Sequence, residues 1–89
     1  MTQMRLVELK DFFNNNGFTS YTLEIGCFIR ATFDTVHVFF TPDTLVFMSN
    51  GNYVKLCEVV SIARTNNHVS ITFDYHGSRM TAEIFCHTV

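Results

Sequence analysis

The fold is decided by VSITFDYHGSRMTAEIFC, Val69 to Cys86, because its residues alternate between apolar and polar types. In a β-strand this period of two places one set of side chains on each face. Gly77-Ser78 fits a two-residue type II′ turn, which favours glycine at its first central position. The stretch therefore predicts an antiparallel hairpin with one apolar face, whose facing pairs are Tyr75 with Met80, Phe73 with Ala82, Ile71 with Ile84 and Val69 with Cys86.

The composition of the 89-residue chain fits one small folded domain, predicted to span residues 1–89. A hydrophobic content of 47% with ten phenylalanines argues against disorder. A net charge of −2 gives no attraction to nucleic acid or to an anionic membrane. The isolated Cys27, Cys57 and Cys86 favour reduced, packed thiols. Because the first residues also lack a signal-peptide pattern, we expect a cytoplasmic location.

An amphipathic helix is predicted over about residues 3–15, where Leu9 and Phe13 fall on one face. Thr2 is a candidate N-cap for this helix. A run of asparagines and then Gly17 should end it, since glycine suits the left-handed position after a helix. Such a helix must pack its apolar stripe on the sheet.

The rest of the chain, about residues 20–87, predicts a six- to seven-stranded antiparallel β-meander. Its alternating segments are separated by the turn signals Asp34-Thr35, Pro42-Asp43 and Asn50-Gly51. Two-residue turns throughout keep one face apolar, with facing pairs that include Ile29 with Phe40, Phe40 with Leu45, Phe47 with Val54 and Leu45 with Leu56. A one-residue slip would reverse that face, whereas a two-residue slip would preserve it. The predicted fold class is α+β, with a sheet that is strongly curved or closed into a partial barrel.

One residue breaks the alternation, because Glu58 falls on the inner parity of a long segment from about Asn52 to Arg64. A bulge or bend would turn the carboxylate outward and let the two halves of the segment pair with different neighbours. The alternative is a carboxylate buried in a pocket, for which the sequence offers no partner.

The outer face of the central strands carries more apolar residues than a solvated face needs. The predicted register places on it a row of Arg30, Phe39, Val46 and Lys55, and beside that row His37, Met48, Tyr53 and Phe28. Either the helix covers these residues or a partner does. Aromatic residues and methionine flanked by arginine and lysine are typical of the core and rim of a protein interface. These eight residues form the candidate partner interface.

The sequence thus predicts a small non-enzymatic interaction module of the adaptor or inhibitor type, a size and type common among bacterial and phage accessory proteins. Its expected partner is a second copy of itself, in a homodimer, with a second protein as a further candidate and no membrane partner. The alternative is a sheet that binds single-stranded nucleic acid through Phe39, Tyr53, Arg30 and Lys55, with the aromatic rings stacking on bases.

Neither an enzyme nor a cofactor is expected, because GxGxxG, GK[ST], HExxH and CxxC motifs are all absent. No metal site is expected either. The predicted register sets His68 opposite His87, but two imidazoles without a third ligand are a poor metal site.

Overall fold

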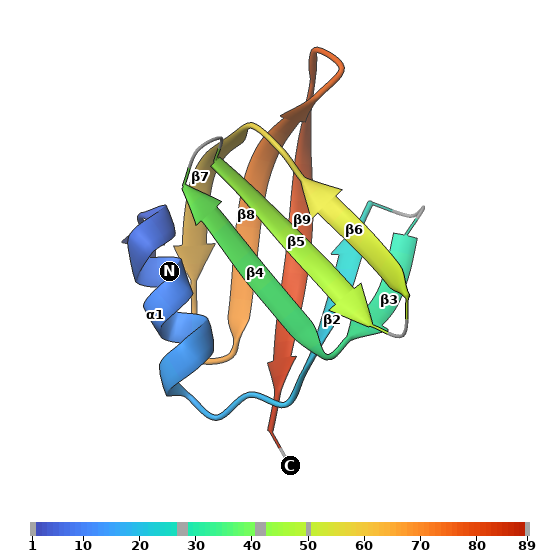
Figure 1. Cartoon of the computed structure of the whole chain (residues 1–89). Coiled ribbons are helices and arrows are strands. Elements are labelled where there is room, and N and C mark those ends of the chain that lie inside the picture. The colour runs from blue at the N-terminus through green and yellow to red at the C-terminus, as the bar shows by residue number, and fades with distance from the viewer. Residues whose placement is uncertain (1, 27–28, 41–42, 50, 89) are drawn as a thin grey trace.

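The described residues form a two-layer antiparallel β-sandwich with one helix at its side (Figure 1). The computed structural model describes residues 2–26, 29–40, 43–49 and 51–88. A three-stranded sheet lies in front of a six-stranded sheet in Figure 1, and the strands of the two sheets cross at an angle. The β8–β9 hairpin projects beyond both layers at the top.

The six-stranded sheet runs in the order β1-β7-β8-β9-β2-β3. Its strands are β1 (Thr2–Met4), β7 (Val59–Arg64), β8 (His68–Tyr75), β9 (Ser78–His87), β2 (Ser20–Ile25) and β3 (Ile29–Phe33). The three-stranded sheet runs in the order β4-β5-β6. Its strands are β4 (Thr35–Phe40), β5 (Asp43–Ser49) and β6 (Asn52–Leu56).

Helix α1 (Leu6–Asn15) begins later than predicted, because the residues before it form β1 and pair with β7. Thr2 is therefore opposite Arg64 in a sheet rather than at a helix N-cap. The N-cap is Arg5, whose side chain makes no capping bond but instead donates a hydrogen bond to Glu8 at 2.9 Å. The predicted end is confirmed, since Gly17 takes a left-handed φ of 67° just past the helix.

The core lies between the two sheets and is closed on one side by α1. Leu9, Phe12 and Phe13 of the helix are buried in it together with the inner residues of both sheets. Phe33 of β3 and Phe47 of β5 join the layers, with ring centroids 5.9 Å apart. Each such fully buried side chain contributes about 1.5–3 kcal/mol to folding.

The long segment around Glu58 is two strands, β6 and β7, that belong to different sheets. Glu58 turns the chain between them with a φ of 54°, and it is exposed, which confirms the predicted outward bend. A register shift between Val59 and Ser61 follows at once. It leaves Val59 opposite Phe73.

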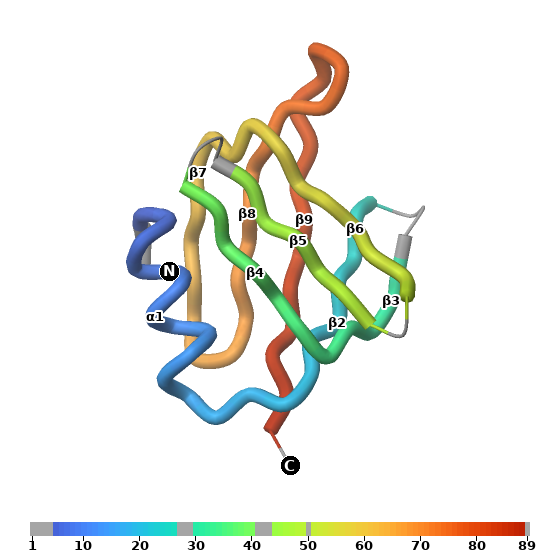
Figure 2. The backbone as a smooth tube through the Cα atoms, in the orientation of Figure 1, coloured from blue at the N-terminus to red at the C-terminus, as the bar shows by residue number. Residues whose placement is uncertain are grey.

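The predicted continuous meander is wrong at two places. Asp34 joins β3 to β4 at a corner between the sheets, so the predicted pairing of Ile29 with Phe40 does not occur (Figure 2). The last strand, β9, lies beside β2 with Leu23 opposite Ile84. Alternation alone cannot distinguish a corner from a hairpin, because both keep the same residues facing inward.

Two hairpins pair in a register that differs by two residues from the predicted one. The same residues still face inward in both hairpins. In β8–β9 the turn is His76-Gly77, with positive φ at both residues, so Tyr75 is opposite Ser78 rather than Met80. This pairing puts Phe85, not His87, opposite His68. In β4–β5 the pairs include Phe40 with Asp43, and the loop residues 41–42 lie outside the described residues.

The β5–β6 register is confirmed, with Phe47 opposite Val54 and Leu45 opposite Leu56. A helix with antiparallel strands agrees in outline with the predicted α+β class. The predicted barrel is wrong, because the described strands form two separate sheets and are more numerous than expected.

Candidate functional site

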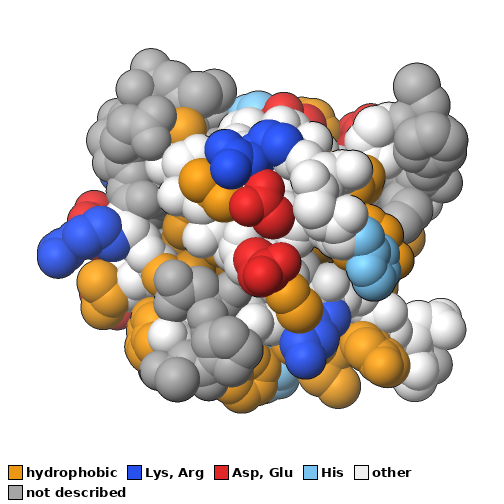
Figure 3. Space-filling view, turned by 90° about the horizontal axis from the view of Figure 1, so that it is seen from above, with side chains coloured by type: hydrophobic (Ala, Val, Ile, Leu, Met, Phe, Trp, Pro, Cys, Tyr) orange, Lys and Arg blue, Asp and Glu red, His pale blue; other side chains and the backbone are white. Residues whose placement is uncertain are grey.

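The outer face of β4, β5 and β6 carries several large apolar side chains in solvent. Phe39 is 50% exposed, Met48 is 43% exposed and Tyr53 is 68% exposed, and Val46 between them is half-buried. We call these four residues the outer patch. Figure 1 shows none of the described helices or strands in front of this face. In Figure 3 hydrophobic side chains line the lower edge, on the side of these strands.

The register brings six of the eight predicted interface residues onto this face. Val46 is flanked by His37 on β4 and by Lys55 on β6, while Met48 is opposite Tyr53. His37 and Phe39 contact each other along β4, with ring centroids 6.4 Å apart. His37 and Lys55 therefore lie beside the outer patch as its polar neighbours.

The other two predicted residues are not part of this arrangement. Arg30 lies on β3 in the six-stranded sheet, opposite Glu24, and its Nε is 4.0 Å from the Glu24 carboxylate. Placing it in a row with Phe39 was wrong, because β3 and β4 do not pair. Arg30 therefore does not lie beside Phe39, Tyr53 and Lys55, the residues with which the nucleic-acid alternative grouped it. Phe28 lies outside the described residues.

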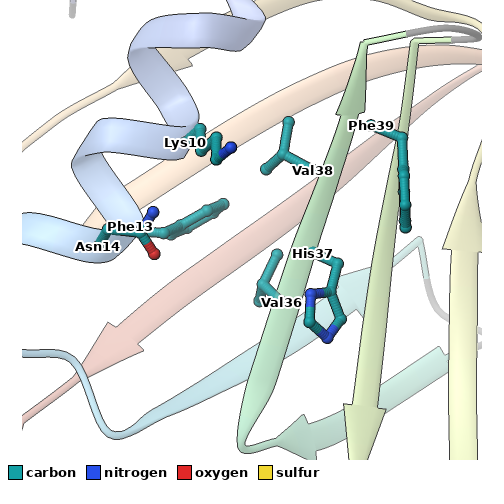
Figure 4. Close-up of a pocket in the computed structure, with 7 residues that line it drawn as sticks. All are labelled: Lys10, Phe13, Asn14, Val36, His37, Val38 and Phe39. Carbon is teal, nitrogen blue, oxygen red and sulfur yellow. The ribbon is translucent and has the colours of Figure 1, made fainter.

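Helix α1 leaves the outer patch uncovered because it lies beside β4 and packs into the core. Figure 4 shows Val36 and Val38 pointing toward the helix, whereas His37 and Phe39 point the other way. A cavity of about 170 Å³ lies between α1 and β4. Lys10 of the helix lies over the ring of Phe40, with its Nζ 5.6 Å from the centroid.

A second apolar feature, which the sequence did not predict, lies along the other edge of the three-stranded sheet. A groove of about 330 Å³ follows β6 and has Ile25, Phe73 and Met80 of the six-stranded sheet among its lining residues. Ile25 and Phe73 are buried, and Met80 is half-buried. The groove exists because the three-stranded sheet is narrower than the sheet behind it, which no local sequence pattern reveals.

Polar side chains of the six-stranded sheet bond to one another around Glu83. His68 Nε2 is 2.5 Å from Glu83 Oε2, and Ser70 donates a hydrogen bond to Glu83 Oε1 at 3.2 Å. The serine hydroxyl therefore contacts the carboxylate, and the same carboxylate contacts the histidine. Burial raises the pKa of the Cys86 thiol to about 12, which keeps it protonated and unreactive at neutral pH.

The described part of the chain holds no group of three or more histidine, cysteine or acidic residues placed to bind a metal ion. None of the helices in that part has the length and apolar character to cross a membrane. Comparison with known proteins gives no significant match to a family model, to a curated protein or to a solved structure. The two apolar surfaces are therefore the features of the described residues that bear on function.

Proposed function

We propose that this protein is a non-enzymatic interaction module that self-associates through its outer patch. The observation that carries the proposal is the exposure of Phe39, Met48 and Tyr53 on one face of a three-stranded sheet. An antiparallel sheet needs only one apolar face to fold, and Leu45, Phe47 and Leu56 supply it. A second apolar face has no role in the core, and clustered apolar side chains at a surface mark an interaction site.

The composition of the face also supports a protein partner. Aromatic side chains and methionine are enriched at protein interfaces, and polar residues form the rim around them. Val46 lies at the centre of the outer patch, between His37 and Lys55. A second copy presents the same surface, so a two-fold contact can bury both patches.

The proposed role is that of an adaptor or inhibitor in the cytoplasm. Cys57 and Cys86 are free thiols, and Cys86 is buried in the core. Free, packed cysteines are typical of reducing compartments, which supports this location.

The proposal is tested by measuring the molar mass by light scattering for the parent chain and for Met48→Glu. We expect a parent dimer of twice the 10.3 kDa chain mass and a monomeric variant, because a carboxylate cannot be buried unpaired in the contact. Since Met48 is exposed, the free energy of unfolding of the isolated chain should change by no more than about 0.5 kcal/mol.

The matched control is Thr81→Glu, which adds the same charge on the outer face of β9 in the other sheet. This variant should keep the mass of the parent. A parent that stays monomeric at high concentration contradicts the proposal. A Thr81→Glu variant that dissociates as fully as Met48→Glu contradicts it too, because net charge and not the outer patch would then be responsible.

A further inference from the structure

The three-stranded sheet ends at β6 with its main chain open to solvent, directly above the apolar groove. Among the described strands β6 pairs with β5 alone. The opposite edge strand, β4, differs in having α1 packed beside it. The sandwich is thus closed on one side by a helix and open on the other along β6.

The groove exposes part of the six-stranded sheet that the smaller sheet does not reach. Ile25 and Phe73 belong to its inner face, as does Met80, which is opposite Phe73. Tyr75 extends this surface and is 58% exposed. A fourth strand beside β6 would cover these side chains in the way that β4 to β6 cover the rest of the sheet.

The main chain of β6 is arranged to accept such a strand. Ser49 is opposite Asn52 across a two-residue loop, and a loop of that length is closed by a pair that exchanges both hydrogen bonds. Bonded and non-bonded pairs alternate along the ladder, so every second residue from Asn52 bonds to β5. The N–H and C=O groups of Tyr53 and Lys55 consequently point away from β5, toward the free edge.

We propose that the β6 edge binds an extended peptide segment of a partner protein as an added β-strand. Its main chain pairs with Tyr53 and Lys55, and its alternate side chains are apolar and enter the groove. Lys55 stands on the outer side of this edge, so an acidic residue on the solvent-facing side of the segment complements it. This surface shares Tyr53 with the outer patch, but strand pairing uses the main chain of Tyr53 and does not depend on self-association.

The occupant is a single strand and not a second whole sandwich. Figure 1 shows β2 and β3 passing behind β6 and continuing past its free edge. A second copy brought edge to edge would meet these strands with its own six-stranded sheet before the two β6 strands could pair. An isolated extended segment needs only the space above the groove.

The test uses a short synthetic peptide in which valine and threonine alternate around a central glutamate. The control peptide has the same composition with its valines grouped together. Binding is measured by calorimetry and by amide chemical shifts. We expect the alternating peptide to bind more tightly than the control and to shift the amides of Tyr53 and Lys55.

Two variants at position 53 separate the contribution of the main chain to peptide binding from that of the side chain. Tyr53→Pro removes an N–H that faces the free edge and leaves the bonds to β5 intact, whereas Tyr53→Ala keeps that N–H. Loss of a hydrogen bond and of close pairing should weaken peptide binding about tenfold or more in Tyr53→Pro. Tyr53→Ala should bind nearly as the parent does.

The proposal is overturned if the alternating peptide binds no better than the control peptide, or if Tyr53→Pro and Tyr53→Ala bind it equally. Met48→Glu distinguishes this proposal from the proposed function. It should abolish self-association and leave peptide binding unchanged, because Met48 is on β5 and outside the groove. Loss of peptide binding in Met48→Glu would place the peptide on the outer patch and contradict edge pairing.

Discussion

The outer faces of the two sheets carry different kinds of side chain. On the six-stranded sheet, polar side chains bond to one another: Thr22 Oγ1 is 2.8 Å from His87 Nε2, and Arg79 donates to Asp74 at 2.6 Å. On the three-stranded sheet, the corresponding positions hold the outer patch. Both sheets bury their inner faces in the same core. The difference supports the proposal that the outer patch serves binding rather than folding.

The largest expected effect tests whether the outer patch really is a surface. Phe47→Ala on the inner face of β5 should lower the free energy of unfolding by about 3–5 kcal/mol, because this fully buried ring leaves a cavity. Phe39→Ala on the outer face should cost less than about 1 kcal/mol. Both variants are made in the Met48→Glu background and unfolded by chemical denaturation. Because that background is expected to be monomeric, association does not contribute to the measured free energy of unfolding. Equal losses would mean that Phe39 belongs to the core and that the two outer faces do not differ as described.

A second prediction concerns the inner side of β2 and β9, beneath the polar outer face. Tyr21 and Cys86 are opposite each other there. Burial raises the pKa of the Cys86 thiol from 9.0 to about 12, and burial also raises the pKa of Tyr21. The unfolded chain therefore loses these protons at lower pH than the folded chain does, so the protein should become less stable as pH rises from about 9 toward about 12.

Denaturation measured at several pH values in this range checks the prediction. Cys86→Ala removes the thiol, so its free energy of unfolding should fall less steeply with pH than that of the parent. Parallel curves for the two proteins would show that Cys86 is not shielded from solvent by the core.

The smallest expected effect is on the polar face itself. Arg79 and Asp74 are partly exposed, with side-chain exposures of 61% and 36%. Arg79→Ala should therefore lower the free energy of unfolding by less than about 1 kcal/mol, and less at high salt. Thermal melts at low and high salt measure this. A loss of several kcal/mol would show that the polar outer face is needed for folding, and the contrast between the faces would then be weaker.

The sequence predicts which residues face inward better than it predicts which strands are neighbours. The inner positions of Leu45, Phe47 and Ile71 follow from alternation, which is local and survives a two-residue slip. The placement of β9 beside β2 joins distant parts of the chain and leaves no local pattern. The sequence does not predict the left-handed conformation of His76, which sets the register of the last hairpin, because Gly77 fits an alternative turn.

The candidate site was predictable to a similar degree. Met48 and Tyr53 share a face because the Asn50-Gly51 signal fixes the β5–β6 register. Arg30 was wrongly placed with them because a corner at Asp34 resembles a hairpin turn in sequence. The groove beside β6 could not be predicted, since it depends on the relative widths of two sheets and on the side that α1 occupies.

The most direct test of the central claim is the oxidation rate of Met48 as a function of protein concentration. Brief treatment with hydrogen peroxide, followed by mass spectrometry of proteolytic peptides, reports the solvent access of each methionine thioether. Met48 is 43% exposed in the single chain, so it should oxidise rapidly in dilute solution and become protected as the protein is concentrated. A rate that stays constant from dilute to concentrated protein would contradict self-association through the outer patch.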